Sequence, residues 1–260
     1  CLSLRENFKV KFFIVDHRIR KNSKKEAKKV IFLLKKFSIN AKLLTWKGKK
    51  PKSNIQSIAR KNRFLLLEKE CKKNKIDNLL LGHHIDDLYE NFFIRLFRGS
   101  GLKGLTSFGK INHNKKLNTR ILRPLIDFEK EDLIYVSKKV FNFYVEDPYN
   151  EDDNFQRSRI RKTLFYFMKE GFDKDKLRLT INNLKSSNEV IKISVENNID
   201  NNAVYFEKKN QFILNIAFFN QADEVSFRSL SKILLLISKR YYSPRGKNIS
   251  NLINQIKSKK

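Results

Sequence analysis

The alternation of short apolar runs with longer amphipathic stretches constrains the fold of this chain most strongly. Three runs rich in β-branched, aromatic or aliphatic residues have the length of strands, at residues 10–15, 41–46 and 78–81. Each precedes a stretch with helical spacing of its apolar residues, at 24–37, 54–73 and 84–97. Strands that alternate with helices in this way indicate right-handed βαβ crossovers. We therefore expect an α/β fold with a parallel sheet covered by helices.

The pattern changes near residue 171. Asn-rich stretches follow, with one strand-like run at 211–219 and two apolar helical patterns at 227–240 and 249–256. Residues 171–260 contain 16 Lys and Arg against 8 Asp and Glu, so +8 of the net charge of +29 lies there and +21 lies before it. We expect two domains, at 1–170 and 171–260, the second smaller and mainly helical.

The amino-acid composition limits the classes of partner and the cellular location that we expect. An excess of 56 Lys and Arg over 27 Asp and Glu favours a phosphate-rich partner such as nucleic acid. A general bias toward Lys, Asn, Ile and Phe explains the excess equally well. No apolar run approaches the ~18 residues of a membrane span, so we expect no membrane association. Cys1 and Cys71 are too few for a disulfide framework or a CxxC pair, which favours a cytoplasmic location.

Polar clusters follow each predicted strand. Asp16 and His17 come after the first strand, and the segment 82–91 (GHHIDDLYEN) comes after the third. Parallel sheets bind ligands outside the carboxyl ends of their strands, so we expect Asp16 and His83 at one edge of the sheet.

The segment 82–91 contains the densest group of reactive side chains. At helical spacing, Asp86 and Glu90 fall on the face opposite the apolar stripe and could hold Mg²⁺ against phosphates. An ordinary amphipathic helix, whose acids favour its positive N-terminal end, is the alternative.

Two further segments offer donors for phosphate. Three of the eight glycines lie within residues 98–105 (RGSGLKGL), where backbone N–H groups could approach a ligand closely. This loop matches neither a Walker P-loop nor a Rossmann fingerprint. Arg157, Arg159 and Arg161 form a compact set suited to phosphate, although a solvent-exposed helix would have the same residues.

The motifs and their order along the chain resemble those of the tRNA(Ile)-lysidine synthetases, members of the N-type ATP pyrophosphatase superfamily. The matching segments are residues 15–20, 46–51, 56–64, 82–87, 98–105, 123–125, 146–150 and 155–161. The resemblance spans residues 10–167 and implies a sheet of the adenine nucleotide alpha hydrolase-like type. The SGGxDS loop of the family is absent, the chain begins with Cys, and its only methionine is Met168. We therefore expect a fragment of a longer product that is inactive alone.

The resemblance also implies a reaction and a set of residue roles. The family adenylates the wobble cytidine of the CAU-anticodon isoleucine tRNA with ATP, and L-lysine then displaces AMP. Catalytic roles are implied for Asp86, Asp87 and Arg98, with Asp86 also a candidate ligand of Mg²⁺. Binding of ATP is implied for Asp16, His17, Arg60, Arg63, Gly82, His83 and His84. Substrate binding is implied for Glu90, Gly99, Ser100, Gly101, Arg159 and Arg161. By position, residues 171–260 would bind tRNA, and a homodimer is a candidate assembly.

Three alternatives stay open. A tRNA thiolase of the same superfamily is the nearest, although such an enzyme usually has paired cysteines. The His and Asp residues of segment 82–91 are also compatible with a metal-dependent phosphohydrolase. The charge alone is compatible with a non-catalytic, basic RNA-binding protein.

Overall fold

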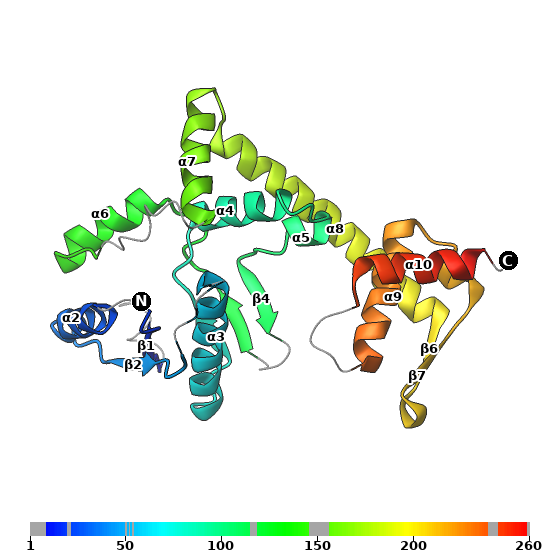
Figure 1. Ribbon diagram of the computed structural model, residues 1–260, viewed down its shortest axis with the longest axis horizontal. Coiled ribbons are helices and arrows are strands. Elements are labelled where there is room, and N and C mark those ends of the chain that lie inside the picture. Colours follow the sequence, from blue (N-terminus) through cyan, green and yellow to red (C-terminus); the bar gives the residue numbers. More distant parts are fainter. Residues whose placement is uncertain are drawn as a thin grey trace. The chain divides into compact units, whose positions relative to one another are not determined.

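The computed structural model describes residues 9–19, 22–49, 51, 53, 55–114, 119–145, 156–238 and 244–258. The predicted motif at 146–150 and Phe155 lie outside these residues. The chain forms two compact units. Figure 1 labels helices and strands of both units. Unit 1 comprises Cys1–His84 and Lys110–Asp127, and unit 2 comprises Ile85–Gly109 and Phe128–Lys260. These units differ from the expected domains, because unit 2 takes in much of the chain before residue 171.

Unit 1 is an α/β assembly. Strand β1 (Phe12–Asp16) pairs in parallel with β2 (Ala41–Thr45), and helix α2 (Ser23–Lys35) connects them. Helix α3 (Ile55–Lys73) leads to β3 (Asn78–Leu80), which pairs in parallel with β5 (Thr119–Leu122). The predicted strands and parallel pairing are thus confirmed. The described strands form two hydrogen-bonded groups, β1–β2 and β3–β5–β4, and β4 (Ile111–Asn114) is antiparallel to β5, which the sequence pattern did not predict.

One hydrophobic core joins the elements of unit 1. Leu44 of β2, Leu79 of β3, and Leu67 and Cys71 of α3 are all buried in it. Residues of β1 and β5 pack against the same cluster. The two strand groups therefore share a core through α3, and the cysteine acts as a small apolar residue within it. Burial accordingly raises the pKa of the Cys71 thiol.

Unit 2 is mainly helical. Its elements are α4 (Ile85–Leu96), α5 (Leu102–Leu105), α6 (Lys130–Phe141), α7 (Gln156–Lys169), α8 (Lys174–Asn202), β6 (Ala203–Phe206), η2 (Glu207–Lys209), β7 (Gln211–Leu214), η3 (Ile216–Phe219), α9 (Asp223–Ser238) and α10 (Gly246–Lys257). Strands β6 and β7 form an antiparallel hairpin. No helix among the described residues has the length and apolarity needed to cross a bilayer.

Helix α8 runs through the Asn-rich stretches that the sequence analysis treated as interruptions. Two of these asparagines are buried and bonded: Asn188 accepts from Arg228, and Asn198 donates to Ser229 Oγ and to the Phe218 carbonyl. Partners on α9 and η3 thus compensate for the weak helix propensity of asparagine. The predicted strand at 211–219 is correct only over β7, because η3 occupies its second half.

The core of the C-terminal part of unit 2 consists of six buried side chains from η3, α9 and α10: Phe218, Phe219, Leu230, Ile233, Ile249 and Ile253. Ile233 is 2% exposed, whereas Leu236, on the same helix, is 52% exposed. The apolar pattern at 227–240 therefore marks a helix with one buried face.

Replacing Ile233 with Ala should lower the free energy of unfolding by about 2–5 kcal/mol, because it removes buried methylene groups and leaves a cavity. Urea unfolding followed by circular dichroism measures this change. Leu236→Ala is the matched control on the same helix, with a change within about 0.5 kcal/mol. Equal losses in both variants would contradict this assignment of the core.

Candidate functional site

The parallel strands of unit 1 place polar residues beyond their carboxyl ends. Asp16, the last residue of β1, lies opposite Thr45, and Trp46 N–H donates to the Asp16 carbonyl at 2.9 Å. In the other strand pair, Leu81 N–H donates to the Leu122 carbonyl at 2.9 Å. His83 and Arg123 therefore follow neighbouring strands. That Asp16 and His83 share one edge stays a prediction.

The Asp16 carboxylate is only 2% exposed. Its Oδ1 accepts hydrogen bonds from Arg18 N–H at 2.9 Å and from Ser23 Oγ at 2.7 Å. Its Oδ2 has no hydrogen-bond partner among the described residues, and neither has Nδ1 of His17. Buried polar atoms are rarely left without a partner. These two atoms can therefore bind a polar ligand at the end of β1.

His17 is held neutral by its surroundings. Burial lowers the pKa of His17, the nearby Arg63 guanidinium lowers it further, and the Asp16 carboxylate partly opposes both. A neutral imidazole has one donor and one acceptor nitrogen, which suits hydrogen bonding to a base or a ribose. Arg60 and Arg63 of α3 both lie against the Phe64 ring, at 5.1 and 5.8 Å from its centroid. The cations predicted to bind ATP are therefore also packed on an aromatic ring.

The acidic face of α4 forms an ion-pair network within unit 2. Asp86 Oδ1 lies 3.5 Å from Lys174 Nζ, and its Oδ2 accepts from Lys130 N–H at 3.2 Å. Asp87 Oδ1 lies 3.7 Å from Arg157 Nη1. Glu90 has no exposed surface and accepts a hydrogen bond from Arg161 Nε.

The spacing on α7 explains which arginines join this network. Arg157 and Arg161 are four residues apart, so both face α4, whereas Arg159 lies on the exposed side. The sequence analysis placed all three arginines in a set suited to phosphate, but the resemblance implied substrate binding only for Arg159 and Arg161. The i, i+4 spacing was the signal that could have distinguished them.

Burial and neighbouring charges shift the pKa values of the residues in this network. Burial raises the pKa of Glu90, although the hydrogen bond and charge of Arg161 oppose the rise. Burial also acts on Lys174, but the Asp86 and Glu129 carboxylates outweigh it and raise the pKa of that ammonium. Burial raises the pKa of Tyr89 to about 12, and its hydroxyl donates to the Lys174 carbonyl at 3.1 Å.

The glycine-rich loop has a structural reason that is independent of any ligand. Gly99 has a φ of +64° just after α4, and Ser100 N–H donates to the Arg95 carbonyl. This is the arrangement of a glycine that ends a helix. A Cβ at Gly104 would lie 2.8 Å from Ser100 Cβ, so the loop is closely packed there. By contrast, a Cβ at Gly82 would meet no atom within 4 Å.

The predicted magnesium ligand is already engaged. Among the described residues, no group of three or more His, Cys, Asp or Glu side chains could hold a metal ion. Asp86 is paired with Lys174, which a cation at this carboxylate would have to displace. The described side chains of unit 2 thus provide no preformed cage for Mg²⁺.

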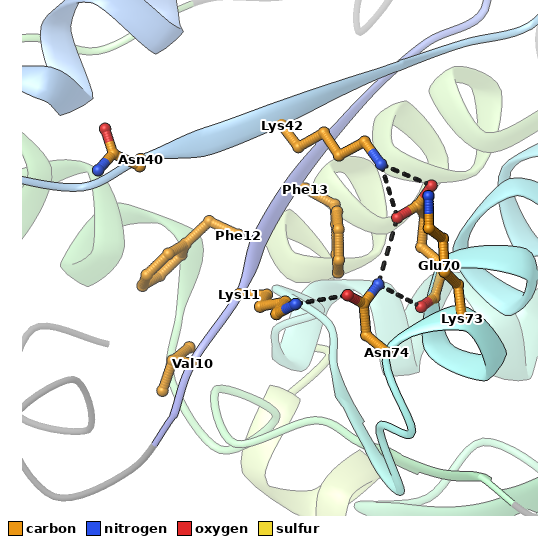
Figure 2. A pocket seen from close by; sticks show the side chains of 9 residues that line it. All are labelled: Val10, Lys11, Phe12, Phe13, Asn40, Lys42, Glu70, Lys73 and Asn74. Atoms are coloured by element: carbon orange, nitrogen blue, oxygen red, sulfur yellow. Dashed lines mark hydrogen bonds and ion pairs between the residues drawn. The ribbon is translucent and has the colours of Figure 1, made fainter.

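A pocket of about 310 Å³ lies at the amino ends of β1 and β2 (Figure 2). Glu70 accepts two bonds from Lys42 Nζ, both at 2.8 Å, and Lys11 donates to Asn74. Because these polar groups satisfy one another, and because Asp16 lies at the other end of β1, this pocket is not the candidate site.

Comparison with known proteins defines the class. The family model for the PP-loop domain matches residues 2–167, and the chain belongs to this family. The predicted superfamily and fold are thereby confirmed. A solved structure, the U34-tRNA thiolase NcsA from Methanococcus maripaludis with its [4Fe-4S] cluster, has a TM-score of 0.53 with 16% identity. The match covers 66% of this chain and 61% of that chain, and it shows a likeness of fold.

Curated relatives give a more particular likeness. The chain is 31% identical over 248 residues to the tRNA(Ile)-lysidine synthase of Orientia tsutsugamushi (strain Boryong), covering 92% of this chain and 55% of that protein. It is 29% identical over 252 residues to the tRNA(Ile)-lysidine synthase of Wolbachia sp. subsp. Brugia malayi (strain TRS), covering 94% and 57%. The chain thus spans a little over half the length of these relatives.

The burial of Glu90 predicts a dependence of stability on pH. Because the pKa of Glu90 is higher in the folded than in the unfolded chain, the folded chain binds more protons between these two values. The free energy of unfolding should therefore fall as the pH rises through this range. Glu90→Gln removes this decline, so its free energy of unfolding relative to that of the wild type should rise as the pH increases through this range.

Urea unfolding at a series of pH values measures the effect. Glu131→Gln, which neutralises an exposed carboxylate on α6, is the control for the loss of one negative charge. A constant difference in stability between Glu90→Gln and the wild type across this range would contradict the prediction.

Proposed function

We propose that the protein to which this chain belongs is a ligase that forms a carbon–nitrogen bond. It would use ATP to attach L-lysine to C2 of the wobble cytidine in the isoleucine tRNA with a CAU anticodon, producing lysidine in the cytoplasm. The extent of the match to tRNA(Ile)-lysidine synthases carries the proposal. The PP-loop domain ends at residue 167, yet these relatives cover 92% and 94% of the chain, so the likeness includes its C-terminal helical part.

ATP would bind at the carboxyl ends of the strands of unit 1. Asp16 Oδ2 and His17 Nδ1 have no partner among the described residues; the carboxylate oxygen suits a hydroxyl or amino donor of a nucleoside, and the imidazole nitrogen suits a donor or an acceptor. Arg60, Arg63, Gly82, His83 and His84 would complete the nucleotide site. ATP supplies the activated adenylyl group, and these residues would hold and orient it.

L-lysine would bind at the acidic face of α4. The Lys174 ammonium lies 3.5 Å from Asp86 and 3.3 Å from Glu129, so this face already accommodates one primary ammonium. Asp87 is the favoured acceptor for the substrate ammonium, because it lies on the same acidic face and its ion pair with Arg157 is long, at 3.7 Å. Glu90, fully buried, would then keep Arg161 in place. Mg²⁺ could bind Asp86, as the resemblance implied, only if Lys174 left this carboxylate.

The tRNA would contact basic residues and the glycine loop. Arg98, Gly99, Ser100 and Gly101 follow α4 directly, and Arg98 Nη2 donates to Gln156 Oε1 at 3.1 Å at the start of α7. The loop thus lies beside the arginines of α7, including Arg159 and Arg161. Residues 171–260, with their net charge of +8, would contribute the second, tRNA-binding domain.

Asp87→Asn should leave folding intact, because it removes a charge at nearly constant volume. In a protein that also carries the SGGxDS loop, we expect lysidine formation to fall by about 10² or more, the scale for loss of one electrostatic contact in a transition state. Incorporation of labelled lysine into tRNA measures the rate. Asp200→Asn, the same change on the exposed side of α8, should retain full activity. Unchanged turnover in Asp87→Asn would refute a catalytic role.

Selection of the tRNA can be tested separately from the reaction. We expect the isoleucine tRNA with a CAU anticodon to outcompete an unrelated RNA of equal length at ~0.15 M salt, because unspecific phosphate contacts are weakened by counterions there. A filter-binding competition measures this preference. The isoleucine tRNA with a GAU anticodon is the matched competitor. Equal competition by all three RNAs would show that the chain binds RNA through its charge alone, without specificity for this tRNA.

A further inference from the structure

Three neighbouring strands of unit 1 bring one buried arginine against one buried histidine. His83 follows β3, Arg123 follows β5 directly, and Asn112 belongs to β4. Arg123 is 4% exposed and His83 is 9% exposed. Arg123 Nε donates to His83 Nδ1 at 3.2 Å, and Arg123 Nη1 donates to Asn112 Oδ1. None of the roles assigned above includes Arg123.

The backbone fixes the direction of this arginine. Arg123 N–H donates to the Lys110 carbonyl at 2.8 Å, which ties its main chain to the residue before β4. Pro124 follows, and a residue that precedes proline is restricted to extended conformations. The hydrogen bond to Lys110 and the proline that follows therefore fix the backbone from which the guanidinium extends. Its charge is buried, so its donors require the acceptors that Asn112 and His83 provide.

The direction of the hydrogen bond determines the tautomer of His83. A guanidinium has five N–H donors and no acceptor, and it is always charged in proteins. The Nδ1 atom of His83 must therefore present its lone pair to Arg123, so the ring proton of the neutral imidazole lies on Nε2. A proton on Nδ1 would place two donors against each other.

We propose that Arg123 is a positioning residue that holds His83 as the Nε2–H tautomer. His83 then acts on the nucleotide as a hydrogen-bond donor through Nε2, suited to a phosphate oxygen of ATP or of the departing pyrophosphate. Proton abstraction through Nδ1 is excluded by the same bond. The role in the reaction rests on the proposed function, whereas the tautomer is a property of the chain itself.

Nitrogen NMR on the uniformly ¹⁵N-labelled chain tests this directly, without ATP or tRNA. The chain has four histidines, so His83→Gln assigns the resonances of His83 by their loss. We expect a protonated Nε2, a bare Nδ1, and a scalar coupling across the hydrogen bond between Arg123 Nε and His83 Nδ1. A proton on Nδ1, or no coupling in the folded wild type, would overturn the proposal.

Two matched variants separate positioning from stability. Arg123→Met should abolish the coupling and shift Nδ1 toward the position of an imidazole nitrogen without a donor. Arg120→Met removes an arginine of β5 whose Nε donates to Asn78 at 2.9 Å, and it should leave the His83 signals unchanged. If Arg123→Met folds and the His83 signals persist, the arginine is structural only and the proposal fails. If it does not fold, the wild-type coupling still decides. A negative result in the tRNA competition with the wild-type chain would count against the proposed function alone, because the NMR measurement involves neither ATP nor tRNA.

Discussion

Glu90 has no exposed surface, and its charge must therefore be compensated within the protein. Arg161 supplies this compensation, with Arg157 nearby, and so links α7 to α4 in unit 2. Removing Arg161 would leave the buried Glu90 charge without this partner, which destabilises the fold. The acidic face that we propose for lysine is thus built around a carboxylate that the lysine does not contact.

In unit 1, the register of the parallel strands brings the candidate functional residues together. Parallel strands end in the same direction, so the residues after β3 and β5 become neighbours although 40 positions separate them in sequence. This closeness allows Arg123 to set the tautomer of His83. A histidine at a strand end has two neutral forms with different chemistry, and the adjacent strand chooses between them.

Much of the fold could be predicted from sequence, whereas the roles of the candidate site residues stay predictions. The strands and helices of unit 1 appear where apolar periodicity placed them, and the family resemblance was confirmed. Helix α8 was missed because asparagine has a weak helix propensity, which buried bonds of Asn188 and Asn198 overcome. Strand β4 was missed because its residues, INHN, alternate without the β-branched run that marks a strand.

The sequence by itself determined the element order, the polar residues after each strand, and the acids on one face of α4. These features follow from local spacing, since periodicities of two and 3.6 residues decide which side chains share a face. Only the tertiary structure decided that Glu90 is buried, that Arg161 of α7 bonds to it, and that Arg123 lies against His83. Each of these depends on which residues distant in sequence pack together, and the energy of a charge or tautomer is set by such neighbours.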